Sequence, residues 1–309
     1  MRSWLIALSI LTTPAYAVPV GLSEKLWIHG SEDCQVNRDP PIEVFAFDPT
    51  TYVLRQNKCL HAEAPFIYVF FGDHTVFVQD TGATAEGDRF PLYDVIRGLI
   101  AERQRATANQ LNVLVTHSHS HSDHTAADAQ FRGQPGVTLI EPTMQAVRNH
   151  FGFGQWPSGQ ANLDLGGRTL IVVPIPGHQD ESLAVYDETT KWLLTGDTIY
   201  PGRLYVKDWA AYKASISRLV DFSKTHEISA VMGTHIEISG AGELFPPGST
   251  FHPNEAPLPL TVDDMLQLHE RLHQAGEKPK EIKMAKFVVA PIGMLQRILG
   301  SILKAVGVR

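Results

Sequence analysis

The sequence has 309 residues, of which 43% are hydrophobic and 19% charged, the composition of an ordinary soluble globular protein with one large domain. The formal net charge of −7 provides no basic surface for nucleic acid, and no block of like charge stands out along the chain. We therefore expect no nucleic-acid partner.

The first 17 residues have the pattern of a secretory signal peptide. Arg2 supplies a positive charge, Trp4 to Leu11 form an apolar run, and Pro14-Ala15-Tyr16-Ala17 resembles an A-x-A cleavage site. A retained anchor helix is the alternative, but roughly ten apolar residues are too few for the ~20 that a spanning helix needs. We predict cleavage near Ala17, no stable membrane span, and a periplasmic or secreted location.

Export changes how the two cysteines are interpreted, because an oxidising compartment permits a disulfide. We predict that Cys34 and Cys59 pair, which would stabilise the fold by about 3 kcal/mol in the chain-entropy model. Two buried free thiols are the alternative. Two cysteines alone make no cysteine-rich zinc site.

The mature chain, residues 18–309, begins with a segment that contains turn signals at Asp39-Pro40-Pro41 and Asp48-Pro49-Thr50. We predict an irregular N-terminal lead-in over residues 18–65 rather than a separate domain. The runs Phe66–Phe71 and Thr75–Asp80 then predict a β-hairpin.

Helices and strands alternate in the next part of the chain. Apolar spacing predicts helices at Pro91–Gln110, Thr125–Phe131, Pro142–Phe151 and Ala210–Thr225. Apolar runs predict strands at Asn112–Thr116, Val137–Ile140, Thr169–Val173, Leu183–Tyr186, Trp192–Thr195 and Ala230–Met232.

Residues 245–309 are predicted to form a C-terminal loop plus helices of the same domain. Five prolines between Phe245 and Pro259 indicate a long loop, called the Pro-rich loop below, and a helix follows at Val262–Gln274. An apolar stripe at helical spacing runs from Met294 to Val306. Packing of this stripe against the body is the first interpretation, and a homodimer or membrane-surface contact is the alternative.

The chemistry is concentrated in the run from His119 to His124, which reads His-Ser-His-Ser-Asp-His and follows a predicted strand. Alternate residues leaving a strand point the same way, so His119 and His121 can grip one metal ion while Asp123 and His124 reach a second. A fortuitous histidine cluster or a nonspecific metal-scavenging tract is the alternative.

Three later positions argue against that alternative. His178, Asp197 and His235 each follow an apolar strand and stand beside small residues that let the backbone turn tightly. A zinc site needs several imidazoles and carboxylates around one point, and these positions supply the remainder.

With these motifs the sequence resembles the metallo-β-lactamase superfamily, whose H-x-H-x-D-H motif and later His, Asp and His residues occur in the same order. The resemblance covers roughly residues 66–235, and Asp80-Thr81-Gly82 matches the first motif of the superfamily. It implies the α/β (α+β) fold class, as a four-layer αββα sandwich with metals at one edge of the two sheets.

The resemblance also implies two zinc ions per chain. His119, His121 and His178 would hold the first, Asp123, His124 and His235 the second, and Asp197 would bridge them. Iron or manganese would suit the same ligand types.

His117 could also be aligned as part of the first histidine pair, but only His119 and His121 have the required spacing to Asp123 and His124. We therefore expect His117 to support a ligand from behind or to be structural. Asp80 is expected to accept hydrogen bonds that hold the His-rich loop in shape. The other histidines, including His252, lack a comparable context.

Two zinc ions that share a water lower its pKa, so we predict hydrolysis by a metal-bridging hydroxide, with Asp123 orienting it and accepting its proton. A nucleophilic serine has little support, because no G-x-S-x-G motif occurs. The Pro-rich loop on one side, and Phe153 with Trp156 on the other, are candidate walls of the substrate pocket. Simple packing is the alternative for each.

Members of the superfamily with different substrates differ at the position of Asp197. True β-lactamases lack this carboxylate, whereas lactonases, glyoxalase II-like thioesterases and many phosphodiesterases carry it. Tyr200 matches a tyrosine with which lactonases donate a hydrogen bond to the substrate carbonyl. For this small-molecule hydrolase we rank ester or lactone cleavage first, thioester second and β-lactam third. A noncatalytic metal-binding scaffold is the alternative outside enzymes.

Overall fold

Strand β3 (Phe66–Phe71) is buried along its whole length, and its two faces meet different layers. Tyr68 and Phe70 lie in the core between the two large sheets, whereas Ile67 and Val69 pack beneath helix α1 (Leu92–Thr107). Successive side chains of a strand point to opposite faces, so a strand that is apolar on both faces needs cover on both.

The computed structural model describes residues 21–293. The predicted signal peptide, residues 1–17, and the apolar stripe from Met294 to Val306 lie outside these residues. Within them, none of the helices has the length and apolar character needed to cross a membrane.

The first large sheet is mixed, with antiparallel pairing up to its fourth strand and parallel pairing beyond it. Its order is β1 (Ile42–Asp48), β2 (Thr51–Gln56), β3, β4 (Thr75–Gln79), β5 (Asn112–Thr116) and β6 (Val137–Leu139). Helices α1 and α3 (Asp128–Phe131) contribute to the core on its outer face.

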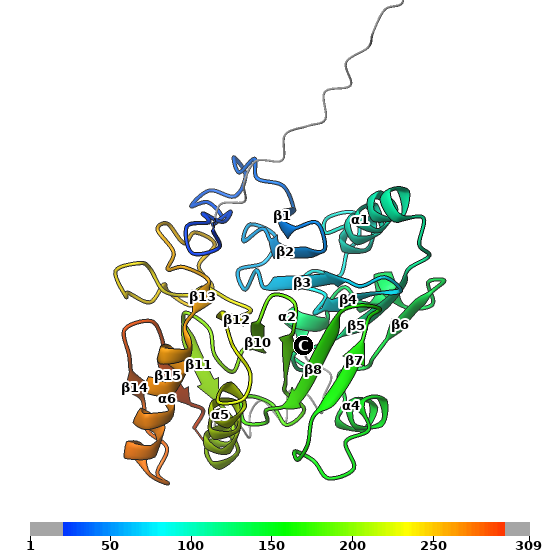
Figure 1. Cartoon of the computed structure of the whole chain (residues 1–309). Coiled ribbons are helices and arrows are strands. Elements are labelled where there is room, and N and C mark those ends of the chain that lie inside the picture. The colour runs from blue at the N-terminus through cyan, green and yellow to red at the C-terminus, as the bar shows by residue number, and fades with distance from the viewer. Residues whose placement is uncertain (1–20, 294–309) are drawn as a thin grey trace, which may run out of the picture.

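The second large sheet is also mixed. Its order is β13 (Pro259–Leu260), β12 (Ala230–Gly233), β10 (Trp192–Gly196), β9 (Leu183–Asp187), β8 (Thr169–Pro174) and β7 (Ala161–Asp164). Helices α5 (Trp209–Ser223) and α6 (Val262–Ala275) pack on its outer face, which completes four layers (Figure 1).

Smaller elements fill the connections. A three-stranded sheet has the order β11 (Arg203–Val206), β15 (Val288–Pro291) and β14 (Ile282–Lys283). Helix α2 (Ser122–Thr125) carries part of the His-rich run, and α4 (Met144–Phe151) precedes β7. The predicted αββα sandwich is confirmed.

The predicted irregular lead-in is wrong for residues 42–56, because β1 and β2 form a hairpin at the edge of the first sheet. The turn signal at Asp48-Pro49-Thr50 marks the turn of that hairpin, where Asp48 accepts hydrogen bonds from the Thr50 backbone and hydroxyl at 2.7 and 2.8 Å. The predicted disulfide is present between Cys34 and Cys59, with Cα atoms 5.2 Å apart.

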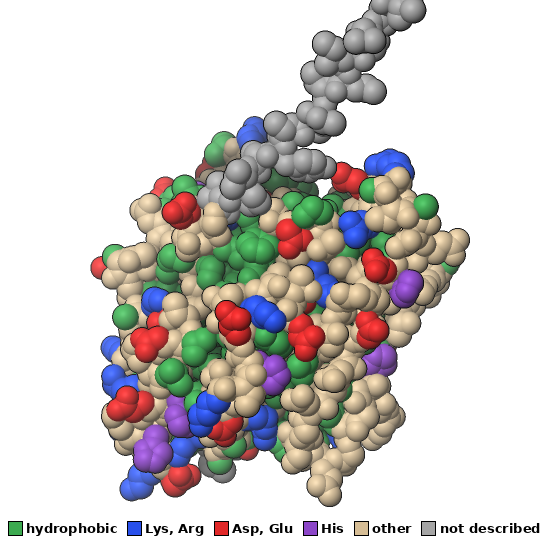
Figure 2. All heavy atoms as spheres, viewed as in Figure 1, with side chains coloured by type: hydrophobic (Ala, Val, Ile, Leu, Met, Phe, Trp, Pro, Cys, Tyr) green, Lys and Arg blue, Asp and Glu red, His purple; other side chains and the backbone are tan. Residues whose placement is uncertain are grey.

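The other predicted elements differ from the structure mainly at their ends. The predicted helix at Thr125–Phe131 is divided between α2 and α3, because the chain turns after the metal-ligand candidates. Strands β7, β11, β14 and β15 were not predicted, since each is short and only partly buried. On the face shown in Figure 2, acidic and basic side chains are interspersed.

Candidate metal centre

All seven predicted metal ligands come together at one edge of the sandwich, in segments that follow the ends of strands, with Asp123 and His124 in helix α2. The strands concerned are β5, β8, β10 and β12. Strands β8, β10 and β12 run in the same direction, so their carboxyl ends meet at a single edge of the second sheet, as in other sites built on parallel strands.

Two glycines beside the ligands allow this convergence. Gly196 has φ +53°, and a Cβ atom there would lie 2.6 Å from Cβ of Ser118. At Gly177 a Cβ atom would lie 2.4 Å from Cα of Tyr212. Any side chain at either position would push apart the segments that carry His119, Asp197 and His178.

The first ligand group consists of His119, His121, His178 and Asp197. Nδ1 of His121 lies 2.9 Å from Nε2 of His119 and 3.1 Å from Nε2 of His178. Those two Nε2 atoms are 3.3 Å apart. Three imidazole nitrogens therefore face one point.

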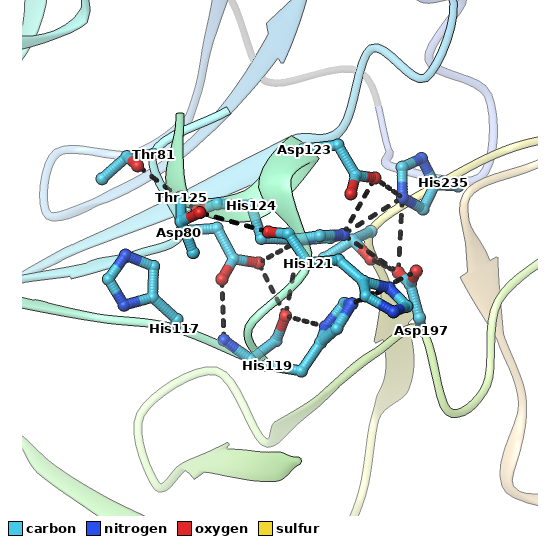
Figure 3. A network of polar contacts seen from close by, with 12 residues as sticks. Asp80, Thr81, His117, His119, His121, Asp123, His124, Thr125, Asp197 and His235 are labelled. Carbon is cyan, nitrogen blue, oxygen red and sulfur yellow. Dashed lines mark hydrogen bonds and ion pairs between the residues drawn. The ribbon is translucent and has the colours of Figure 1, made fainter. Parts of the chain in front are cut away.

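The second ligand group consists of Asp123, His124, His235 and again Asp197. Oδ2 of Asp123 lies 3.3 Å from Nε2 of His124 and 3.4 Å from Nε2 of His235. Figure 3 shows these side chains pointing toward one another, with Asp197 beside them.

Asp197 joins the two groups through different oxygens. Its Oδ1 lies 3.4 Å from Nε2 of His124 and 3.3 Å from Nε2 of His235. Its Oδ2 lies 3.7 Å from Nε2 of His119 and 3.5 Å from Nε2 of His178. One carboxylate thus presents one oxygen to each group, the arrangement predicted for a bridging ligand.

These separations fit metal ligation. Ligand atoms 2.0 to 2.2 Å from a tetrahedral zinc lie about 3.4 Å from one another, and within each group the ligand atoms lie within 4.8 Å of one another. The donors are imidazoles and carboxylates, which zinc, iron and manganese all accept. The residues present therefore fit two metal ions.

Each candidate histidine ligand has its other ring nitrogen held from behind, as is usual for metal-binding histidines. The partners are Oγ of Ser118 for His119, the Gln179 amide for His121, Oδ2 of Asp80 for His124, the Tyr205 carbonyl for His178 and the Glu63 carbonyl for His235.

Asp80 holds the His-rich loop as predicted, and Figure 3 shows its carboxylate beside His124. One oxygen accepts a hydrogen bond from the Ser118 backbone at 2.7 Å, and the other lies 2.9 Å from Oγ of Ser118 and 3.0 Å from Nδ1 of His124. Ser118 also contacts His119, so this one carboxylate supports a ligand of each group.

Electrostatics differ between the groups. Burial lowers the pKa of His119, and it lowers the pKa of His121 to about 4, so these imidazoles are neutral. Burial acts in the same direction at His124, but Asp123 and Asp197 outweigh it and hold its pKa well above the usual range. A metal ion requires neutral imidazole, so binding at the second group releases protons.

The hydroxyl of Tyr200 is directed away from the ligand atoms. It lies within hydrogen-bond distance of two acceptors, the Arg203 carbonyl at 2.5 Å and Oε2 of Glu237 at 3.0 Å. The ring packs edge-on against His235, with ring centroids 5.4 Å apart. A donor role toward substrate remains a prediction that would require this hydroxyl to leave both acceptors.

His117 belongs to neither ligand group. Its Nε2 lies 2.8 Å from Oδ1 of Asp128 and its Nδ1 lies 3.2 Å from the Ile140 carbonyl, so it ties β5 to α3 and to the end of β6. His252 is buried in the Pro-rich loop and stacks on Phe245.

The predicted pocket walls lie on two sides of the ligands. The Pro-rich loop lines a cavity beside Glu63 and Glu237. On the other side, Trp156 packs against Phe153 and donates its indole hydrogen to the Asp180 carbonyl, next to Gln179, which contacts His121.

Several supporting groups were not predicted from the sequence. Ser118 and Gln179 stand next to predicted ligands in the sequence. Their positions drew attention to them, but the sequence did not indicate what their side chains do. Glu63 and Tyr205 act through backbone carbonyls, which no side-chain pattern reveals. Thr234 donates a hydrogen bond to Oδ1 of Asp197, and its position before His235 was the available signal.

The chain is similar to one family model and to several known proteins. A family model described as "Metallo-beta-lactamase superfamily" matches residues 62–282. The human (Homo sapiens) acyl-coenzyme A thioesterase MBLAC2 is 25% identical over 215 residues, which cover 58% of this chain and 75% of that protein. A hydroxyacylglutathione hydrolase from Aeromonas hydrophila is 30% identical over 124 residues, which cover 39% of this chain and 47% of that protein.

A solved structure gives a likeness in fold alone. The chain of TMB-1 aligns with a TM-score of 0.50 and 16% sequence identity, covering 77% of this chain and 100% of that one. Its alignment agrees with the two-sheet architecture described above.

Proposed function

The chain belongs to the metallo-beta-lactamase superfamily and is a metal-dependent hydrolase, and we propose that the bond it cleaves is a thioester. The observation that carries the proposal is Asp197, whose two oxygens face the two ligand groups. The relatives add the substrate class, because their printed names are those of an acyl-coenzyme A thioesterase and a hydroxyacylglutathione hydrolase, both of which act on thioesters.

The donor set supports the metal assignment that the resemblance implied. His119, His121 and His178 would hold one zinc ion, Asp123, His124 and His235 the other, with Asp197 shared. Zinc bound there would lower the pKa of a water molecule and polarise the substrate carbonyl.

The side chains of this protein supply orientation around that water. His124 and His235 outweigh the opposing effect of burial and keep the pKa of Asp123 well below its usual range, so its carboxylate is ionised. It can therefore accept a hydrogen bond from the attacking water and direct its lone pair toward the carbonyl. Asp80 and Ser118 hold the histidines at fixed angles.

Ester or lactone cleavage, ranked first from the sequence, is the second candidate. The observation that favoured it was Tyr200, whose hydroxyl is engaged by Glu237 and by the Arg203 carbonyl. Thioester cleavage needs no such donor, and the relatives favour it. β-Lactam cleavage ranks below both, and a noncatalytic scaffold has no need of a shared carboxylate.

Export to the periplasm or outside the cell is part of the proposal. The Cys34–Cys59 disulfide supports it, because such bonds persist in oxidising compartments and are rare in the cytosol.

The test is a matched pair of substrates that differ in one atom. Zinc-loaded protein is assayed with S-acetyl-N-acetylcysteamine and with its oxygen counterpart, alongside a lactone and a β-lactam. We expect the highest kcat/KM with the thioester, and loss of that activity in Asp197→Ala with the fold retained by circular dichroism. A higher kcat/KM for the oxygen ester or the lactone would refute the thioester assignment.

A further inference from the structure

A cavity of about 80 Å³ lies beneath the Pro-rich loop. Residues 244–249 and His252 form one wall of the cavity. Charged side chains from other parts of the chain also line it, namely Lys58, Glu63, Arg203 and Glu237. The loop is held in place, since Glu255 forms a buried ion pair with Arg55 of strand β2. The cavity is therefore a built feature of the fold.

The cavity adjoins the metal centre. The Glu63 carbonyl lies 3.0 Å from Nδ1 of His235, and the Tyr205 carbonyl lies 2.8 Å from Nδ1 of His178. Both Glu63 and Tyr205 line the cavity. Two residues of the cavity lining are thus in direct contact with candidate metal ligands.

Two cationic side chains, Lys58 and Arg203, line this cavity, and Lys58 is the more deeply buried of them. Lys58 is 2% exposed, and its Nζ donates a hydrogen bond to the Ala62 carbonyl at 2.8 Å. An ammonium has three hydrogens to donate, yet within residues 21–293 this carbonyl is its one acceptor and no carboxylate pairs with it. Burial, followed by the nearby Arg55, lowers the pKa of Lys58 to about 8, against the opposing effect of the carboxylates of Glu255, Glu237 and Glu63, so the group is charged at neutral pH.

The remaining charges leave the cavity short of acceptors. Glu237 is already satisfied by the Tyr200 hydroxyl and the Arg203 backbone, and Glu63 is exposed at the mouth. In the described part of the chain, no hydrogen bond or ion pair engages the Arg203 guanidinium. Lys58 and Arg203 therefore both keep N–H groups that an acceptor inside the cavity can engage.

We propose that this cavity is a subsite for one anionic group, a carboxylate or a phosphate, on the thiol half of the substrate, and that Lys58 binds it. The inference rests on the proposed thioesterase function. Coenzyme A carries phosphates and glutathione carries carboxylates, so the thiol halves named for the relatives share this chemistry. The volume suits one such group, since whole-ligand pockets have about 300 Å³ or more.

The test compares thioesters that share an acetyl group and differ in the charge of the thiol half. Acetyl-coenzyme A supplies phosphates, S-acetylglutathione supplies carboxylates, and S-acetyl-N-acetylcysteamine is neutral. Lys58→Met and Lys58→Gln remove the ammonium, and Lys213→Met, at a lysine paired with exposed Glu277, is the matched control. Thermal unfolding and metal content establish that each variant is folded and loaded.

We expect either Lys58 variant to raise KM at least about tenfold for one anionic thioester, the loss typical of one charge-assisted hydrogen bond. KM and kcat for the neutral thioester should stay within twofold. An unchanged KM for both anionic substrates, or an equal rise for all three, would overturn the proposal, because the second pattern is that of a purely structural lysine.

Direct binding separates this proposal from the proposed function. Titration calorimetry with free coenzyme A and with glutathione measures the subsite without turnover. Weaker binding of one thiol to Lys58→Met than to the parent supports the subsite even if no thioester is cleaved, which would refute the function alone. Equal binding of both thiols to parent and variant would refute the subsite.

Discussion

Asp80→Asn is the substitution that probes the support of the metal centre most selectively. Asp80 has φ +72°, a left-handed conformation that asparagine tolerates better than most residues, so the backbone can stay as it is. The amide oxygen can still accept the 2.7 Å hydrogen bond from the Ser118 backbone. The amide nitrogen, however, would replace the oxygen that faces Nδ1 of His124 and the Ser118 hydroxyl.

His124 then loses its charged acceptor and meets a donor instead. Loss of such a partner typically lowers metal affinity by about 10- to 100-fold, which corresponds to about 1.4 to 2.7 kcal/mol. Because Asp80 contacts His124 directly and reaches His119 only through Ser118, the second ligand group should lose more affinity than the first.

The assay is competition for zinc against a chromogenic chelator, which resolves two dissociation constants per chain. Asp73→Asn, at the exposed turn before β4, is the matched control and should leave both constants unchanged. We expect the dissociation constant of the second ligand group to rise by about 10- to 100-fold in Asp80→Asn. The dissociation constant of the first ligand group should change less. Two unchanged constants in folded Asp80→Asn would refute the role assigned to Asp80.

Other predictions concern stability and Tyr200. Arg168→Met breaks a buried ion pair with Asp187 and should lower the free energy of unfolding by about 3 to 5 kcal/mol in urea titrations; a loss below about 1 kcal/mol would contradict it. Burial opposes ionisation of Asp187, but Arg168 keeps the pKa of Asp187 below its ordinary value of 3.8. The stability contributed by this ion pair should therefore be complete above pH 3.8 and fall as the pH drops through the lower pKa of the folded state. Unfolding measured along an acid titration tests this, and a contribution unchanged by acid would oppose it. Cys34→Ser with Cys59→Ser should cost about 3 kcal/mol of unfolding free energy, and equal stability of variant and parent would count against this. Tyr200→Phe removes a buried hydroxyl and should cost about 1 kcal/mol of stability while kcat for the thioester stays within twofold; a tenfold fall in this kcat at full metal content would support the donor role predicted from the sequence.

The ligand run was predictable because it needs little of the fold. The spacing from His119 to His124 places donors on both sides of one turn, and the later ligands each follow an apolar strand. The four-layer architecture came from a resemblance carried by the same motifs. Local spacing thus pointed to the His-rich run, and the resemblance implied the full set of seven ligands.

Other features depend on contacts that the sequence does not encode locally. The hairpin at residues 42–56 was missed because β1 is partly exposed at a sheet edge and the prolines in this segment resembled a break. The supporting carbonyls of Glu63 and Tyr205 become visible only when distant segments pack. The direction of the Tyr200 hydroxyl depends on Glu237, a partner 37 residues away along the chain.

The central claim is that two metal ions, held in the two ligand groups, make this chain a thioester hydrolase. The most direct test titrates zinc into the metal-free chain and follows the initial rate of S-acetyl-N-acetylcysteamine hydrolysis. We expect almost no rate without metal and a rate that rises until two equivalents are bound, as the two ligand groups require. A full rate in metal-free protein, or no hydrolysis at two bound equivalents, would contradict it.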